Sequence, residues 1–232
     1  MASPPRAVTF DLWQTLMHDS KDQAAKRGRM RAERIHQVLA RAGHAATVEQ
    51  VEALVKDIWN EWQATYWDKL VDPGFDAQMA WLQERLRVPG GDGRLSEDLR
   101  HAYVDPIFAV APVVDAEAIP VLTQLQARGL PLGLICNTSV TPGFALRRLL
   151  AQWGLDRLLR VQLFSDEMGV RKPAPEIFQE AARQLGVQPV DMLHVGDSVE
   201  NDVEGAQAAG ARALLVGPEA PLSRVFSTLQ TN

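Results

Sequence analysis

One feature constrains the fold of this chain more than any other: from residue 112 onward, short apolar segments alternate with segments of helical periodicity. The apolar segments 132–136, 161–164, 192–195 and 213–216 are too short for helices and are expected to be strands. Helices are expected between and before them, at 116–128, 142–153, 175–185 and 203–209. Parallel strands need such helical crossovers, so the pattern predicts a parallel sheet with helices on both faces.

An earlier strand and a helical insertion complete the predicted architecture. Ala7–Phe10 is a short apolar segment and is expected to be a buried strand. Residues 20–87 have apolar positions at helical spacing; Gly43 and Asp72-Pro73-Gly74 separate three helices, and Pro89-Gly90-Gly91 is expected to be a loop. The sequence therefore predicts an α/β domain with a doubly wound, Rossmann-like parallel sheet, formed by residues 1–16 and 112–232. An all-helical cap, residues 17–111, is inserted into it.

Composition narrows the class of partner. The 232 residues are 46% hydrophobic and 23% charged, as in an ordinary globular protein, and the formal net charge of -5 argues against a nucleic-acid partner. A small anionic substrate remains compatible, because the local field of a pocket can oppose the global charge. The single cysteine forms no internal disulfide, and neither a signal core nor a membrane-length apolar run is apparent. We expect a cytoplasmic protein that does not contact membranes.

Residues suited to phosphoryl transfer follow the carboxyl ends of the expected strands. Working residues in open α/β sheets lie at this edge. The candidates, in chain order, are Asp11, Cys136, Asn137, Lys172, Asp197 and Asp202. A carboxylate nucleophile, a cation that balances the phosphoryl group and acidic ligands for a hard metal are what phosphoryl transfer requires.

These residues belong to four stretches: residues 10–16, 136–139 and 169–173, and residues 196–198 followed by Asn201-Asp202. In this order the stretches resemble the four motifs of the haloacid dehalogenase-like hydrolase superfamily, and the insertion after the first motif resembles the helical cap of that family. The resemblance implies that Asp11 is a nucleophile that forms an aspartyl-phosphate or an alkyl ester, and that Lys172 balances its charge. It implies a Mg²⁺ site formed by Asp11, the backbone carbonyl of Trp13, Asp197 and Asp202, the last supporting either the metal or the lysine. It also implies substrate contacts from backbone and side-chain groups of these residues: Leu12, Trp13, Cys136 and Asn137.

Three positions depart from the family pattern. Trp13 replaces the second aspartate of the phosphatases, which acts as general acid and base, Gln14 replaces a glycine, and Cys136 replaces a serine or threonine. A positioned acid or base contributes roughly 10²–10⁴-fold to the rate, so its loss should slow such an enzyme without abolishing turnover.

These residues leave three functions open. The first is a Mg²⁺-dependent phosphatase of a small phosphorylated metabolite. The second is a 2-haloacid dehalogenase, since those enzymes resemble this chain in having an aromatic residue at Trp13, although they typically lack the aspartate matched here by Asp197. The third, least favoured, is a catalytically impaired member of the family that binds a ligand or partner without turnover.

Several other residues have an ordinary structural interpretation. Trp59 and Trp62 are three residues apart, which predicts packing between cap helices, although some of the cap aromatics could instead line an apolar substrate pocket. Arg27, Arg29 and Arg31 are expected on a solvated helix face, although one of them could meet a substrate carboxylate or phosphate. His18 is expected at the surface, near the entrance to the cap, and Cys136 is expected to be a small buried residue.

Overall fold

The sheet is the centre of the computed structural model, which describes residues 4–88 and 93–230. Its strands are β1 (Ala7–Phe10), β4 (Leu132–Cys136), β5 (Val161–Phe164), β6 (Met192–Gly196) and β7 (Arg212–Leu215). They pair in the order β5-β4-β1-β6-β7, and every pairing is parallel. Phe10 at the end of β1 aligns with Leu134 and Val195, so the carboxyl ends of the central strands share one edge. The predicted α/β fold is confirmed.

Helices cover both faces of this sheet. One apolar cluster joins β-strand side chains such as Phe10 and Leu134 to α6 (Ala118–Ala127), α7 (Gly143–Gln152) and α11 (Val225–Gln230). The other joins Ile135 and Met192 to α9 (Pro175–Leu185) and α10 (Gly205–Ala208). Adjacent residues of each strand thus enter different clusters, as the alternation of side chains along a strand requires.

Two details of the core differ from the sequence expectation. The helix expected at 203–209 begins earlier, as a π-helical turn η3 (Val199–Glu204), and continues as α10. Ser198 caps this turn by accepting a hydrogen bond from the backbone N–H of Asn201. Short segments α8 (Ser165–Met168), η2 (Pro189–Asp191) and η4 (Leu222–Arg224) also lie outside the predicted pattern. Each has at most four residues, too few to show a helical period.

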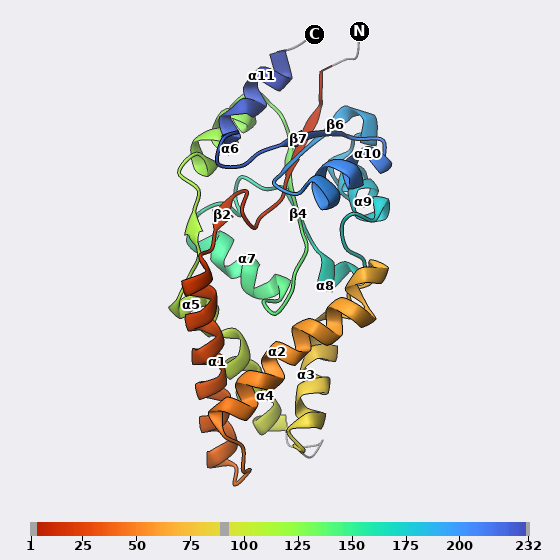
Figure 1. Cartoon of the computed structure of the whole chain (residues 1–232). Coiled ribbons are helices and arrows are strands. Elements are labelled where there is room, and N and C mark those ends of the chain that lie inside the picture. Colours follow the sequence, from red (N-terminus) through yellow and green to blue (C-terminus); the bar gives the residue numbers. More distant parts are fainter. Residues whose placement is uncertain (1–3, 89–92, 231–232) are drawn as a thin grey trace.

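A helical insertion lies at the end of the molecule opposite the two termini (Figure 1). It consists of α1 (Lys21–Arg41), α2 (Val48–Thr65), η1 (Trp67–Lys69), α3 (Gly74–Arg85), α4 (Gly93–Val104) and α5 (Pro106–Ala109). Capping boxes, Ser20 with Gln23 and Thr47 with Gln50, start α1 and α2. The helices α4 and α5 were not predicted, and the expected loop Pro89-Gly90-Gly91 lies outside the described residues. A short antiparallel pair, β2 (Met17–His18) and β3 (Val113–Val114), connects the insertion to the sheet.

A second contact fixes the insertion over the carboxyl edge of the sheet. Asp72, in the connection between α2 and α3, is buried and accepts hydrogen bonds from Thr138, Ser165 and Arg171 of the core. Gly74 adopts a φ of +84°, and a Cβ there would lie 2.9 Å from the carbonyl oxygen of Asp166. This close approach requires glycine. Within the described residues, no helix is long and apolar enough to span a membrane.

Candidate active site

A buried ion-pair network forms where β1 and β6 end. The Nζ atom of Lys172 lies 2.6 Å from Oδ1 of Asp11 and 2.6 Å from Oδ1 of Asp202. Asp11 follows β1, and its backbone N–H donates to the carbonyl of Val195 on β6 at 2.9 Å. All three charged side chains are buried, with exposed fractions of 6% for Asp11, 2% for Lys172 and 1% for Asp202. The structure thus brings together three of the residues that the sequence placed at this edge.

Two polar residues inside the sheet extend this network. Nε2 of His194 lies 3.1 Å from Oδ1 of Asp202, and Nδ1 lies 2.9 Å from Oγ1 of Thr9. Burial lowers the pKa of His194, so the imidazole is neutral, and the contact with Asp202 places its proton on Nε2. The sequence analysis missed Thr9 and His194. Each is a polar residue within an otherwise apolar strand, and this feature of the sequence could have indicated a buried polar contact.

The position of Asp202 depends on Gly196. A Cβ on Gly196 would lie 2.2 Å from Cγ of Asp202, which is far inside van der Waals contact. Asp202 cannot easily move away, because Lys172 and His194 hold Oδ1 and the backbone N–H of Ser198 donates to Oδ2 at 2.9 Å. The glycine before Asp197 therefore makes room for the network.

The network sets the protonation of its members. Burial raises the pKa of Asp11 to about 7, although Lys172 acts in the opposite direction. Burial also acts to lower the pKa of Lys172, but Asp11 and Asp202 together raise it above its ordinary value. For Asp202, burial is outweighed by Lys172 and His194, which hold its pKa well below the usual range. Lys172 and Asp202 therefore form a charged pair, and Asp11 is the carboxyl whose charge is most readily changed.

Three carboxylates meet beside this lysine. Asp11, Asp197 and Asp202 each offer an oxygen, and these oxygens lie within 4.8 Å of one another. Asp197 is exposed and makes no ion pair within residues 4–88 and 93–230. Both oxygens of Asp202 are engaged, so Asp11 and Asp197 are the better placed ligands. Oxygen donors of this kind fit a hard divalent cation such as Mg²⁺.

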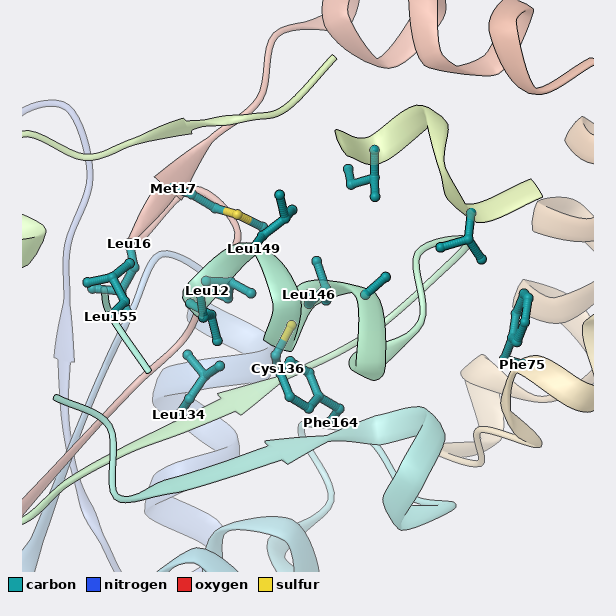
Figure 2. Close-up of a cluster of buried hydrophobic side chains, with 14 of the residues drawn as sticks. Leu12, Leu16, Met17, Phe75, Leu134, Cys136, Leu146, Leu149, Leu155 and Phe164 are labelled. Atoms are coloured by element: carbon teal, nitrogen blue, oxygen red, sulfur yellow. The ribbon is translucent and has the colours of Figure 1, made fainter. Parts of the chain in front are cut away.

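Asn137, which directly follows β4, holds the backbone of Lys172. Nδ2 of Asn137 donates to the carbonyl of Lys172 at 2.9 Å, and Oδ1 accepts from the backbone N–H of Lys172 at 2.8 Å. The side chains of Leu12 and Cys136 lie in the apolar cluster against Leu146 of α7 (Figure 2). Any contact of Leu12 or Cys136 with a substrate would therefore use their backbone groups. Burial raises the pKa of the Cys136 thiol well above its ordinary value, so the thiol stays neutral.

A pocket of about 520 Å³ lies between the helical insertion and this edge of the sheet. Trp13 and Asn137 line it from the core, and Arg27, Arg31 and Trp59 line it from the insertion.

The expected packing of the cap tryptophans is confirmed. Trp62 is buried and packs against Trp81 with ring centroids 6.0 Å apart, and Trp59 packs against Trp67 with ring centroids 5.0 Å apart. Trp59 is also 47% exposed and lines the pocket.

The expectation for the arginines was wrong for two of the three. Arg29 is solvated, whereas Arg27 and Arg31 are buried, because the face of α1 that carries them packs against other parts of the insertion.

His18 is exposed, as expected, and belongs to a second pocket of about 530 Å³ that Asp197 also lines. Its Nε2 lies 2.7 Å from Oδ2 of Asp115, and its Nδ1 lies 3.3 Å from Oε1 of Gln14. Gln14 has a φ of 59°, in the left-handed region. The turn after the candidate nucleophile therefore keeps the backbone conformation for which glycine is best suited, although a glutamine stands there.

Comparison with known proteins identifies the family. Residues 5–210 match the model of the haloacid dehalogenase-like hydrolases. The chain is a haloacid dehalogenase-like hydrolase. The hydrolase is 41% identical over 112 residues to a glyceraldehyde 3-phosphate phosphatase of Methanopyrus kandleri, covering 47% of this chain and 45% of that protein. It is 32% identical over 158 residues to a phosphoserine phosphatase of Thermus thermophilus, covering 65% of this chain and 61% of that protein.

These matches span about half of the relatives' own lengths, 45% and 61%. Among solved structures, the hydrolase is similar to a 2-haloacid dehalogenase of Pseudomonas syringae, with a TM-score of 0.63 and 26% identity. That match covers 93% of this chain and 87% of the other. The curated relatives are thus named as phosphatases, whereas this structural neighbour is named as a dehalogenase.

Proposed function

We propose that the hydrolase is a Mg²⁺-dependent phosphatase of a small phosphorylated metabolite and that Asp11 is its covalent nucleophile. The observation that supports this best is the group of three carboxylate oxygens, from Asp11, Asp197 and Asp202, within 4.8 Å of one another and beside Lys172. In our proposal residues 1–16 and 112–232 form the catalytic core, and residues 17–111 form a helical cap that covers the substrate.

One carboxylate oxygen of Asp11 is held by Lys172, and the other is available to attack phosphorus. Oδ1 is bound to Lys172 at 2.6 Å, which leaves Oδ2 as the attacking atom. In the first step Oδ2 forms a bond to phosphorus while the bond from phosphorus to the ester oxygen breaks, and the alkoxide leaves. In the second step water attacks the phosphorus of the aspartyl-phosphate, which releases inorganic phosphate and restores the Asp11 carboxylate.

Lys172 offsets negative charge in both steps. Its ammonium touches Asp11 and, within the same buried site, can approach the transferring phosphoryl group, as phosphoryl transfer requires. Asp202, oriented by His194 and Ser198, keeps Lys172 charged and in place. Asn137 fixes the backbone of Lys172. Backbone N–H groups of Leu12, Trp13 and Asn137 would bind the phosphoryl oxygens.

Asp11, Asp197 and the carbonyl of Trp13 would hold the Mg²⁺, with Asp202 close by. When bound, Mg²⁺ neutralises charge on the phosphoryl oxygens and on Asp11. An adjacent cation favours the ionised form of a carboxyl, so it would lower the raised pKa of Asp11 and provide the charged nucleophile at neutral pH.

A second function, 2-haloacid dehalogenase, has one specific observation in its favour. Trp13 stands where the phosphatases of the family carry an acid, and halide leaves without a proton. The structural likeness to the P. syringae dehalogenase is consistent with it. Asp197 argues against it, because an exposed carboxylate beside Asp11 repels the carboxylate of a haloacid unless a cation is bound between them.

The experiment that tests the proposal compares the two products directly. Purified protein is incubated with p-nitrophenyl phosphate, a panel of phosphorylated metabolites, and 2-chloropropionate, with Mg²⁺ or with excess chelator, and both phosphate and chloride are measured. We expect phosphate release that requires Mg²⁺ and is absent from Asp11→Asn, whereas Asp76→Asn, a change at an exposed carboxylate, is active. Chloride release that persists with chelator would instead establish the dehalogenase.

A further inference from the structure

Two buried arginines on α1 face the pocket between the helical insertion and the sheet. Arg27 and Arg31 are four residues apart and therefore lie on one helix face. Their exposed fractions are 6% and 4%, and both line the 520 Å³ pocket. Burying a cation is costly unless an anion compensates its charge. The partners of the two side chains therefore show whether this charge is balanced.

Arg27 is balanced within the protein. Its guanidinium forms an ion pair with both carboxylate oxygens of Asp19 and also donates to the carbonyl of Val110 at 3.0 Å. Arg171, which enters the same pocket from the core, is likewise balanced by Asp72 at 3.2 Å.

Arg31 is different. Its Nε donates to the carbonyl of Tyr103 at 2.7 Å, and its guanidinium carbon lies 4.7 Å from the centre of the Tyr103 ring. Across residues 4–88 and 93–230, no carboxylate pairs with Arg31, and the bond from Nε is the one hydrogen bond of its side chain, so the two terminal nitrogens donate to no protein atom. Burial, with a smaller effect of Arg27, lowers the pKa of Arg31, yet a guanidinium stays charged in a protein. Within the described residues, a positive charge thus lines the pocket without an anionic partner.

The pocket joins Arg31 to the candidate active site. Trp13 and Asn137 line the same pocket; Trp13 is two residues from Asp11, and the side chain of Asn137 holds the backbone of Lys172. A substrate whose phosphoryl group lies at Asp11 would therefore extend its leaving group into this space. Trp13 and Trp59 would contact the carbon atoms of that leaving group.

We propose that Arg31 binds a carboxylate on the leaving group, so that the substrate is a small phosphorylated carboxylic acid. This inference rests on the proposed phosphatase function. The two terminal nitrogens of Arg31 match the two oxygens of a planar carboxylate. A single negative charge also balances the single unpaired cation, whereas a second phosphate group would bring roughly 1.5 to 2 charges.

Two matched pairs of phosphate esters test the inference in the unaltered protein. 2-Phosphoglycolate is compared with 2-hydroxyethyl phosphate, and O-phosphoserine with O-phosphoethanolamine, because the members of each pair differ at the carboxylate. A hydrogen-bonded charge contact contributes about 1.5–3 kcal/mol, which corresponds to roughly 10- to 100-fold. We expect kcat/KM to be higher by that factor for at least one carboxylated ester, relative to its partner.

Variants assign the preference to Arg31. Arg31→Met should remove the roughly 10- to 100-fold preference through a lower kcat/KM for the carboxylated ester, with little change for the ester that lacks the carboxylate. Arg31→Lys keeps the positive charge but lacks the planar guanidinium with its two terminal nitrogens, so this variant should retain part of the preference for the carboxylated ester. Arg29→Met is the matched control, because Arg29 lies on the same helix but is exposed and paired with Glu33 and Glu52. Far-UV circular dichroism confirms that each variant is folded.

The outcomes separate this inference from the proposed function. If p-nitrophenyl phosphate is hydrolysed in an Asp11-dependent reaction but the members of both pairs react equally well, the carboxylate site is wrong and the phosphatase stands. If a preference exists and folded Arg31→Met keeps it, Arg31 is not its source and the inference fails. If no phosphate ester is hydrolysed, the proposed function and the inference fall together.

Discussion

Removing the carboxylate of Asp72 should destabilise the protein far more than removing an exposed carboxylate nearby. Asp72 belongs to the helical insertion but lies buried against the core. Its Oδ2 accepts hydrogen bonds from Ser165 at 2.7 Å, Thr138 at 3.2 Å and Arg171 at 3.2 Å, and its Oδ1 accepts one from the backbone N–H of Gly74 at 3.2 Å. The substitution Asp72→Ala removes all four bonds and leaves a nearly buried guanidinium without its counter-ion.

The expected magnitude follows from the burial of the pair. The side chain of Asp72 is 1% exposed and that of Arg171 is 13% exposed. Removing one partner of a buried ion pair lowers the free energy of unfolding by about 3–5 kcal/mol. Arg171 still donates to the carbonyl of Thr138 at 3.0 Å and lies 4.5 Å from the ring centre of Trp67, so we expect the lower end, about 3 kcal/mol. For a chain of this length that corresponds to a Tm lower by about 6–12 °C.

Urea unfolding measures this loss. Far-UV circular dichroism and tryptophan fluorescence are followed together, because the free energy of unfolding is defined only where the two transitions coincide. The control is Asp76→Ala on α3, whose side chain is 87% exposed in its pair with Arg100 and should lose less than about 1 kcal/mol. A loss for Asp72→Ala no larger than that of the control would refute the reasoning.

Three further predictions concern the candidate active site. Because Trp13 cannot protonate a departing alkoxide, p-nitrophenyl phosphate should be hydrolysed roughly 10²–10⁴-fold faster than simple alkyl phosphates under saturating Mg²⁺, and a flat series of rates would mean that another residue supplies the proton. Because burial raises the pKa of Asp11 to about 7, Mg²⁺ must displace a proton below that pH, so its affinity should fall about tenfold for each pH unit below 7 and level off above it. Titrations with Mg²⁺, followed by tryptophan fluorescence across about pH 5–9, measure this dependence. If the affinity of Asp11→Asn for Mg²⁺ falls with pH as steeply as that of the parent, the assignment of the proton to Asp11 is contradicted. His194→Leu removes the donor that orients Asp202 and should cost about 1–3 kcal/mol of stability in urea unfolding and lower kcat more than it raises KM; kinetics identical to the parent would show that Asp202 needs no such support.

The sheet and the charged centre were predictable from the sequence for a simple reason. Each strand is short and apolar, and parallel strands bring their carboxyl ends to one edge, so Asp11, Lys172 and Asp202 meet although 161 residues separate the first two. Strand order alone predicted that these residues share one edge of the sheet, whereas the contact of Lys172 with Asp11 and Asp202 was expected from the family resemblance.

Other parts of the site depended on contacts that no local pattern encodes. The pair of Thr9 and His194 forms because β1 and β6 align these residues in register, and the sequence does not specify which strands are neighbours. The burial of Arg31 depends on the carbonyl of Tyr103, 72 residues later, on a helix that was not predicted. Asp72 was interpreted as part of a helix break, whereas its partners Thr138, Ser165 and Arg171 come from the core.

The central claim is that Asp11 carries the phosphoryl group during turnover, and rapid acid quench tests it most directly. Protein mixed with Mg²⁺ and a radiolabelled phosphate ester is quenched during the first turnover, digested, and mapped by peptide. We predict acid-stable label on the peptide that contains Asp11, formed and lost at rates that account for phosphate release, and no label on Asp11→Asn. Steady phosphate release with no label on Asp11, or with full activity in folded Asp11→Asn, would contradict the account.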